Sequence, residues 1–290
     1  MKKYLIVTDS TTDLPVEYEE NNDLLVLPMT YTLDGDVYKH DLANSELSVE
    51  DFYTKIKNGA TSKTTQINPT DFYAIFEECV VKGYGVLGLF FSSGLSGTFN
   101  SARIAYEQIL ENYPDASIKI IDSLCASMGE GLLIHYAIKA QNSGMSLEDN
   151  ASYIEELKHK ISHWFTVMDM DTLKRGGRIS ASSAFFAKTL HINPVLNVSE
   201  EGKLVARMKK VGRKSAIMAL ADKFVETYDK DNNDVVFISH SESNSDVEYL
   251  KKVIEERTGM SKFVVGNIGP VIGSHCGAGT LALFYVSESR

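Results

Sequence analysis

Residues 91–98, FSSGLSGT, place hydroxyl and glycine residues where anion binding is chemically favourable. The segment follows an apolar run, 85–91, and precedes an amphipathic stretch, 99–113, so it should connect a buried strand to a helix. Glycines let the backbone approach a ligand, and hydroxyls with free amides at a helix N-terminus favour an anion. An ordinary capped turn explains the same pattern equally well. Neither the GxxxxGK(S/T) pattern of a P-loop nor the GxSxG pattern of a hydrolase is present.

Two further segments carry groups that could meet an acidic ligand. Residues 64–72, TTQINPTDF, form a second hydroxyl-rich loop before a helix, although the same residues also fit a simple N-cap. Residues 170–180, MDTLKRGGRIS, hold a glycine pair between two arginines, the second of which is Arg178. Guanidinium groups can clamp an acidic group, and a loop that only needs glycine is an equal alternative.

The C-terminal part adds a glycine-rich segment and a basic cluster. In residues 269–279, GPVIGSHCGAG, we expect an exposed loop whose His275 could donate to an oxyanion, and a small buried Cys276. The basic cluster could face a phosphate or an acidic partner, or simply be the solvated face of a hairpin. It consists of Lys203, Arg207, Lys209, Lys210, Arg213 and Lys214.

Composition sets broad limits on function. The 290 residues are 43% hydrophobic and 23% charged, as in globular proteins, and the net charge of −10 argues against a general nucleic-acid binder. The longest near-apolar run, 84–91, is too short to span a membrane. The apolar core within residues 1–10 is too short for a secretory signal. The three cysteines form neither a zinc motif nor a disulfide framework, which predicts a reduced, cytoplasmic protein. His159 and His163 lack an evident third ligand, so we expect no metal site there.

The elements that must position these groups differ between the two halves. In the first half, strands at 4–8, 85–91 and 117–121 alternate with helices at 47–57, 70–81, 99–113, 126–141 and 147–160. This alternation predicts βαβ units and a parallel sheet, with a hairpin at 29–38. The second half reads as strands at 163–168, 194–198, 203–211, 234–239, 262–267 and 281–286 with helices at 214–228 and 245–257. We place a domain border near residue 165, which gives domains 1–165 and 166–290.

Seven segments occur in the order that is typical of one family. They are TDSTTDL, TTQINPTDF, SSGLSGTFNSA, IDS, LKRGGRIS, NPVL and PVIGSHCGAG. Over nearly its whole length the chain resembles the DegV family of bacterial fatty-acid-binding proteins, which includes the acyl-carrier subunits of fatty acid kinase. The resemblance implies two α/β domains, a three-layer α/β/α domain with a parallel sheet and a two-layer α/β domain with a mixed sheet. It places one fatty acid between them.

The resemblance also implies which residues hold the ligand. In the family, a threonine of the first loop and the serine of the SGT segment hold the carboxylate, which points to Thr64 and Ser96 here. Thr65 and Gly97, their neighbours, belong to the same implied site. This chain has TTQI where the family usually has TSQP, and Thr61 competes for the alignment. Thr64 is preferred because the following glutamine, proline and phenylalanine then fall in register.

Three basic residues complete the implied site. Arg178 matches the arginine of the GGR segment, and His275 matches a histidine that lies near the head group. In the family, that histidine and an arginine that corresponds to Arg213 are associated with the phosphotransfer partner. The partner implied is an ATP-dependent fatty acid kinase.

The expected function is therefore that of a carrier without turnover and without a cofactor. The carrier would present a long-chain fatty acid to the kinase, and the acyl phosphate would enter phospholipid synthesis with only transient membrane contact. Two alternatives stay open: a binder of a small phosphorylated or keto sugar, and an acyl hydrolase with Ser96 as nucleophile and His275 as base. No helix-turn-helix pattern supports a transcriptional regulator.

Overall fold

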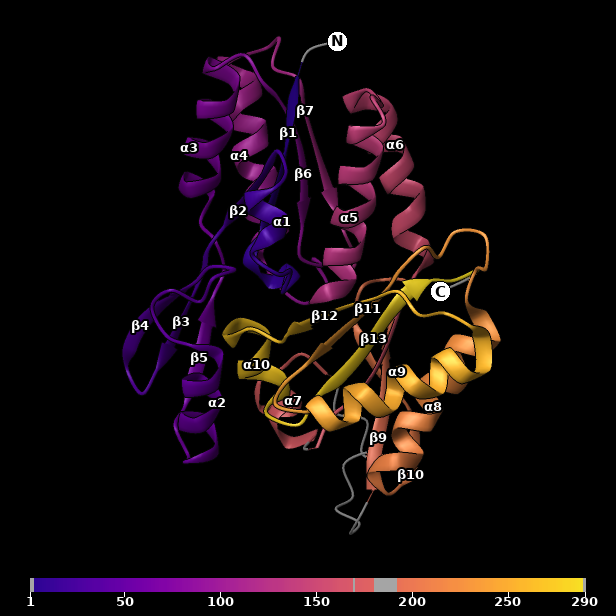
Figure 1. Cartoon of the computed structure of the whole chain (residues 1–290). Coiled ribbons are helices and arrows are strands. Elements are labelled where there is room, and N and C mark those ends of the chain that lie inside the picture. Colours follow the sequence, from indigo (N-terminus) through magenta and orange to yellow (C-terminus); the bar gives the residue numbers. More distant parts are fainter. Residues whose placement is uncertain (1–2, 169, 180–191, 289–290) are drawn as a thin grey trace.

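The computed structural model describes residues 3–168, 170–179 and 192–288 (Figure 1). The N-terminal part contains a parallel sheet of four strands in the order β2-β1-β6-β7. Its strands are β1 (Tyr4–Asp9), β2 (Leu24–Leu27), β6 (Gly85–Phe90) and β7 (Ile118–Asp122). The short apolar runs of β1 and β6 are buried, as parallel strands covered on both faces must be.

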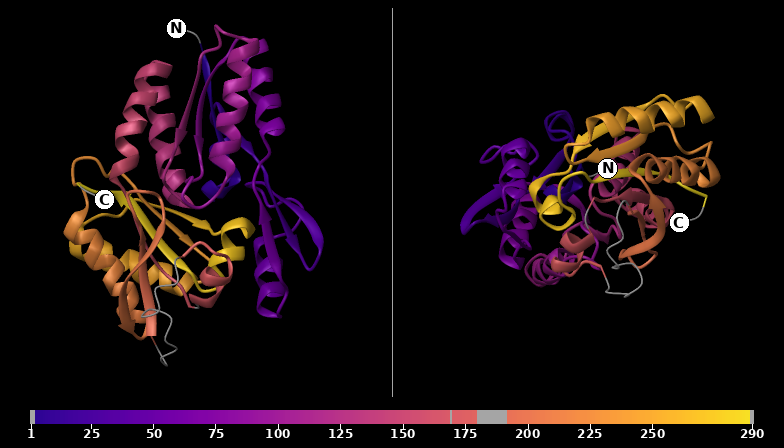
Figure 2. Two further views of the ribbon diagram at one scale, coloured as in Figure 1. Left: turned by 180° about the vertical axis from the view of Figure 1, so that it is seen from behind. Right: turned by 90° about the horizontal axis from the view of Figure 1, so that it is seen from below.

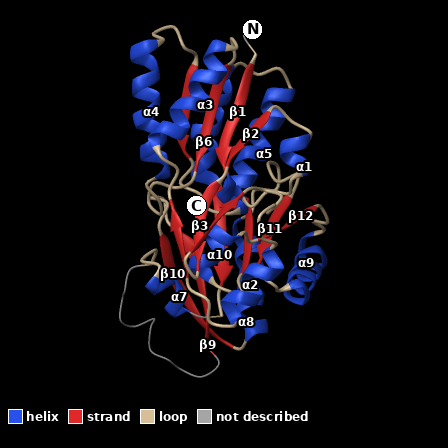
Figure 3. Ribbon diagram, turned by 90° about the vertical axis from the view of Figure 1, so that its left-hand side faces the viewer, coloured by secondary structure: helices blue, strands red, loops and turns tan. Residues whose placement is uncertain are grey.

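Helices cover both faces of this sheet (Figure 3). They are α3 (Pro69–Val81) and α4 (Thr98–Asn112) on one face, and α5 (Met128–Asn142) and α6 (Leu147–Leu157) on the other. Because side chains alternate along a strand, Val7 and Val86 pack with α3 and α4, while Ile6 and Leu87 pack with α5 and α6. The parallel sheet predicted from the sequence pattern is confirmed, and so is the three-layer α/β/α arrangement that the family resemblance implied.

A separate mixed sheet of six strands has the order β10-β9-β8-β13-β11-β12. Figure 2 shows its orange and yellow strands beside the helices of the same colours. Its strands are β8 (Ile161–Thr166), β9 (Ile192–Val198), β10 (Leu204–Val211), β11 (Val236–His240), β12 (Phe263–Asn267) and β13 (Leu281–Val286). Only β11 and β12 pair in parallel. The expected two-layer α/β arrangement, a mixed sheet with helices on one face, is therefore also confirmed.

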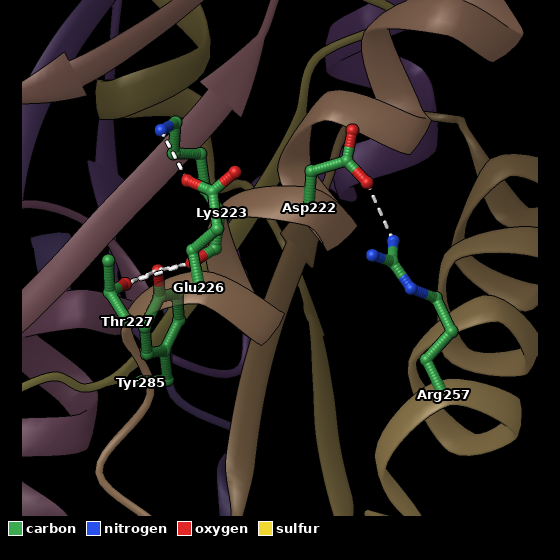
Figure 4. Close-up of polar contacts among 6 residues, drawn as sticks. All are labelled: Asp222, Lys223, Glu226, Thr227, Arg257 and Tyr285. Atoms are coloured by element: carbon green, nitrogen blue, oxygen red, sulfur yellow. Dashed lines mark hydrogen bonds and ion pairs between the residues drawn. The ribbon is translucent and has the colours of Figure 1, made fainter.

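Helices α8 (Arg213–Thr227) and α9 (Asn244–Thr258) cover one face of the mixed sheet. The Thr227 hydroxyl pairs with the Tyr285 hydroxyl at 2.7 Å, which fixes α8 to β13 (Figure 4). An ion pair of 2.7 Å between Asp222 and Arg257 joins the two helices (Figure 4). The opposite face of the sheet is left to pack against α5 and to border a cavity.

A small three-stranded sheet, β4-β3-β5, extends beside the mixed sheet (Figure 1). The elements of this region are β3 (Met29–Leu33), β4 (Asp36–His40), β5 (Ser62–Thr65) and α2 (Val49–Lys57). The expected hairpin is confirmed, and both turn residues, Asp34 and Gly35, have positive φ angles of 52° and 98°. The remaining short helices are η1 (Ser10–Thr12), α1 (Glu17–Glu20), η2 (Lys158–Lys160), α7 (Met170–Arg175) and α10 (Pro270–Cys276).

Some expectations about local structure were wrong. The first part of the 64–72 segment is strand β5 rather than loop, and most of the glycine-rich 269–279 segment is helix α10. Strand β2 was not predicted, because its four residues are too few to show a recognisable hydrophobic pattern. His159 lies in η2 and His163 in strand β8, so their spacing is not helical. The placement of the domain border at residue 165 stays a prediction.

Candidate ligand-binding site

A cavity lies between the loops at the carboxyl ends of the parallel strands and the face of the mixed sheet that α8 and α9 leave uncovered. Most of its wall is apolar. Representative lining residues are Met29, Phe91, Leu95, Phe165, Leu173, Val198, Leu204, Val271, Ile272 and Phe284.

Four polar residues of the lining lie close together, and we call this part of the cavity the polar end. The Thr64 hydroxyl lies 2.9 Å from His275 Nε2, and both residues line the cavity together with Ser96 and Arg178. Arg178 Nε donates to the carbonyl of Leu95, the residue before Ser96, at 3.3 Å. The structure therefore brings together four of the residues that the sequence predicted, from four separate segments of the chain.

The neighbours Thr65 and Gly97 do not line the cavity. Strand alternation turns Thr65 to the opposite face of β5, where it is exposed. Gly97 has another role, because a Cβ atom there would lie 2.0 Å from Oε1 of Gln66. Gln66 Nε2 in turn donates to Ser101 at 3.0 Å, so the glycine lets β5 and the start of α4 pack together.

Thr61, the alternative to Thr64, lies outside the cavity as well. It is exposed, and its backbone N–H donates to Asp34 in the β3–β4 turn at 2.8 Å. The geometry therefore favours Thr64 as the threonine that faces a ligand. Ser180, the last residue of the predicted 170–180 segment, lies outside the described residues.

The expectation of an exposed His275 was wrong. The residue lies in α10 and is partly buried, and its ring packs against the backbone of Gly176, where a Cβ atom would be 2.4 Å from Nδ1. Burial lowers the pKa of His275 to about 4, and the positive charge of Arg178 acts in the same direction. The imidazole is therefore neutral at neutral pH, and among the described residues its buried Nδ1 has no hydrogen-bond partner.

Arg213 lies outside the lining of the cavity. From the first turn of α8, its Nε donates to Asp246 at 2.8 Å and its Nη2 donates to the carbonyl of Gly279 at 2.7 Å. Gly279 follows α10, which carries His275. The geometry of Arg213 therefore suits a residue that fixes this loop.

A buried carboxyl group that the sequence reasoning did not single out connects the two sheets beside the cavity. Asp13 accepts from the backbone N–H of Gly269 at 2.9 Å and from the hydroxyl of Ser127 at 2.5 Å. Ser127 also pairs with Ser239 of β11 at 2.9 Å, and both serines line the cavity. Burial raises the pKa of Asp13 to about 7. Sequence pattern offered one signal, the second aspartate of TDSTTDL, but not its partners.

Comparison with known proteins shows which family has this architecture. A family model described as "Uncharacterised protein, DegV family" matches residues 3–288. The chain belongs to the DegV family. A DegV domain-containing protein of Clostridium perfringens is 40% identical over 290 residues, which cover 100% of this chain and 99% of the relative.

Solved structures of other proteins have the same fold. A fatty-acid-binding DegV family protein from Thermus thermophilus has a TM-score of 0.86 and 28% identity, and the match covers 99% of this chain and 100% of that one. A stearic-acid-binding protein from Eubacterium ventriosum has a TM-score of 0.87 and 27% identity, with 98% of each chain covered. Within the described residues of this DegV protein, no helix is long and apolar enough to cross a membrane.

The geometry gives little support to an acyl hydrolase. His275 Nε2 contacts Thr64, whereas Ser96 pairs with the hydroxyl of Thr98 at 2.9 Å and accepts from its backbone N–H at 3.2 Å. Hydrolytic activation needs a hydrogen bond from nucleophile to base and a third group that orients the base. Among the described residues, no hydrogen bond joins Ser96 to His275. His275 Nδ1 also lacks a partner there, so no third group orients the imidazole. This arrangement is suited to binding.

Proposed function

We propose that this protein binds one long-chain fatty acid and holds its carboxylate at the Thr64–Ser96 end of the cavity. The observation that carries the proposal is a cavity with a mostly apolar wall in which Thr64, His275 and Arg178 lie close together beside the Ser96 segment. The fatty-acid-binding DegV protein from Thermus thermophilus and the stearic-acid-binding protein from Eubacterium ventriosum, at 28% and 27% identity, support the same ligand class.

The free energy of burying an acyl chain is sufficient for tight binding of a fatty acid. Each buried methylene contributes about 0.8 kcal/mol, so a chain of about sixteen carbons contributes on the order of 12 kcal/mol before ordering costs. Each hydrogen bond to the carboxylate adds about 1.5–3 kcal/mol and fixes which end of the ligand faces the polar groups. A small sugar phosphate would leave most of this apolar wall without a partner.

The hydrogen-bond directions leave two donors for a carboxylate. If His275 carries its proton on Nε2, it donates to Thr64, and the Thr64 hydroxyl is free to donate to the ligand. Ser96 Oγ accepts from the backbone N–H of Thr98 and lies 2.9 Å from the Thr98 hydroxyl. If the Thr98 hydroxyl donates in this pair, the Ser96 proton is also free to point at the ligand. Arg178 lies beside this end and supplies positive charge. The neutral imidazole then serves to orient Thr64.

A titration with two ligand classes tests the binding proposal. The delipidated protein should bind palmitate in calorimetry and show a higher melting temperature with it, while dihydroxyacetone phosphate should do neither. The opposite preference would replace the fatty acid with a small phosphorylated ligand.

We further propose that a kinase phosphorylates the bound carboxylate in place, as the family resemblance implies. The carrier would then deliver acyl phosphate to phospholipid synthesis, with a cytoplasmic location and only transient contact with membranes. The basic cluster lies on β10, an edge strand of the mixed sheet, in the turn before it and at the start of α8. Lys203, Arg207, Lys209 and Lys214 are exposed there, where they can attract an acidic partner surface.

Reversing charge in this cluster should slow acyl phosphate formation. In a Lys209→Glu/Lys210→Glu variant we expect a rate at least about tenfold lower at low salt, because docking charges act mainly on association. Hydroxylamine trapping with a fatty acid kinase and ATP measures the rate. Lys251→Glu/Lys252→Glu on α9 is the matched control, and equal rates for both variants would remove the cluster from the docking step.

A further inference from the structure

The register of the mixed sheet determines the shape of the cavity floor. Ala282 of β13 lies directly opposite Phe165 of β8 and Ser239 of β11. Two residues further along β13, Phe284 lies opposite His163 and Phe237. Residues that face each other in an antiparallel pair share one face of the sheet, and this is the face that borders the cavity.

The floor therefore consists of successive rows of side chains that start near the polar end. Thr280 comes first, and its hydroxyl donates to the carbonyl of Cys276 at the end of α10. The next row contains the small side chains of Ala282 and Ser239 beside the larger ring of Phe165. The next row, about 6.8 Å further on at two residues along the strand, is bulky and aromatic. We call His163 and Phe284, the two lining members of that row, the end wall.

The end wall is held firmly in place. Its two rings make an edge-to-face contact with centroids 5.3 Å apart, and each residue is only 2% exposed. His163 Nδ1 donates to the carbonyl of Ile161 at 3.0 Å, and Nε2 accepts from the backbone N–H of Ala126 at 3.3 Å. A Cβ atom on Gly129 of α5 would lie 2.1 Å from Nε2, so the helix backbone closes against the ring.

We propose that the end wall stops the acyl chain and thereby sets the longest fatty acid that the protein accepts. The inference rests on the proposed fatty-acid binding and deepens it. In this proposal the carboxylate is held at the Thr64–Ser96 end, and the far end of the acyl chain lies against Phe284. Ala282 and Ser239 provide the last space before the wall. A chain that is too long must displace the rings or leave its head group unpaired.

Two substitutions with opposite effects test the proposal. Phe284→Leu should shift the preferred saturated acid to longer chains, and each methylene newly buried should strengthen binding about fourfold. Ala282→Leu should shift the preference to shorter chains and weaken binding of the longest acids by at least about tenfold. Affinities of delipidated proteins for the C12, C14, C16, C18 and C20 acids, measured by calorimetry, give the profile.

Phe224→Leu is the matched control, because this buried phenylalanine packs on the other face of the same sheet. It should lower the melting temperature without a shift in chain length. Unshifted profiles in two folded variants would overturn the end wall while leaving fatty-acid binding intact. A wild-type protein that binds none of the acids would instead refute the proposed function. If Phe284→Leu fails to fold, the Ala282→Leu profile decides alone.

Discussion

A Thr64→Val/Ser96→Ala double variant should bind palmitate about 10²–10⁴ times more weakly than the wild type, since each hydrogen bond to a charged group is worth about 1.5–3 kcal/mol. Both hydroxyls line the polar end of the cavity, and neither substitution changes the apolar wall. The acyl chain should therefore still enter, but its carboxylate would lose the donors that orient it. Calorimetry with the delipidated protein measures the loss.

The control for this experiment is a Thr65→Val/Ser93→Ala variant. These two residues belong to the same segments but are exposed and lie outside the cavity lining. The control should bind palmitate within about threefold of the wild type. A comparably small loss in the Thr64→Val/Ser96→Ala variant would mean that other groups hold the carboxylate.

The free energy of unfolding should contain a contribution from Asp13 that decreases as pH rises from about 4 to about 7. Burial raises the pKa of Asp13 to about 7, whereas the unfolded value is 3.8, so the folded protein binds the extra proton in this window. The contribution is fully present below pH 4 and is lost as pH rises through 7. Its largest slope is about 1.4 kcal/mol per pH unit for one proton.

Asp13→Asn isolates this contribution. Asparagine can still accept from the N–H of Gly269 and can donate to Ser127, so the contact between the sheets survives in an uncharged form. Urea unfolding at pH 5, 6, 7 and 8 should show that the variant gains stability relative to the wild type as pH rises. The difference is the informative quantity, because buried histidines such as His40, whose pKa burial lowers to about 4, act in the opposite direction.

Exposed Asp115 provides the control, and Asp115→Asn should leave the pH profile unchanged. Burial also raises the pKa of Asp9 and of Glu130, so some pH dependence of the same sign should persist in the Asp13→Asn protein. A difference between wild type and Asp13→Asn that stays constant from pH 5 to pH 8 would show that Asp13 does not titrate in this range.

The parallel sheet, the hairpin and the long helices could be predicted because their patterns are local. Strand β6 is a continuous apolar run, and the Asp34-Gly35 turn carries its own backbone signal. Helix α10 could not be predicted, because its seven residues include a proline and a glycine, which usually mark loops. Its helical form depends on packing against α2, β3 and β5, which are distant in the sequence.

The candidate site was predictable only in part, for the same reason. Family motifs pointed to Thr64, Ser96, Arg178 and His275, and these do meet at one end of the cavity. The cavity wall itself follows from strand register, as the pairing of Ala282 with Phe165 illustrates. Register joins residues more than a hundred positions apart and leaves no pattern in a single sequence. The buried contacts of Asp13 are of the same long-range kind.

The most direct test of fatty-acid binding is mass spectrometry of what the protein retains. The chain should be expressed, purified without detergent, denatured and extracted with organic solvent. We expect a near-stoichiometric C14–C18 fatty acid in the wild-type extract and a strongly reduced amount from the Thr64→Val/Ser96→Ala variant. An extract without fatty acid, together with a melting temperature that added palmitate does not raise, would contradict the account.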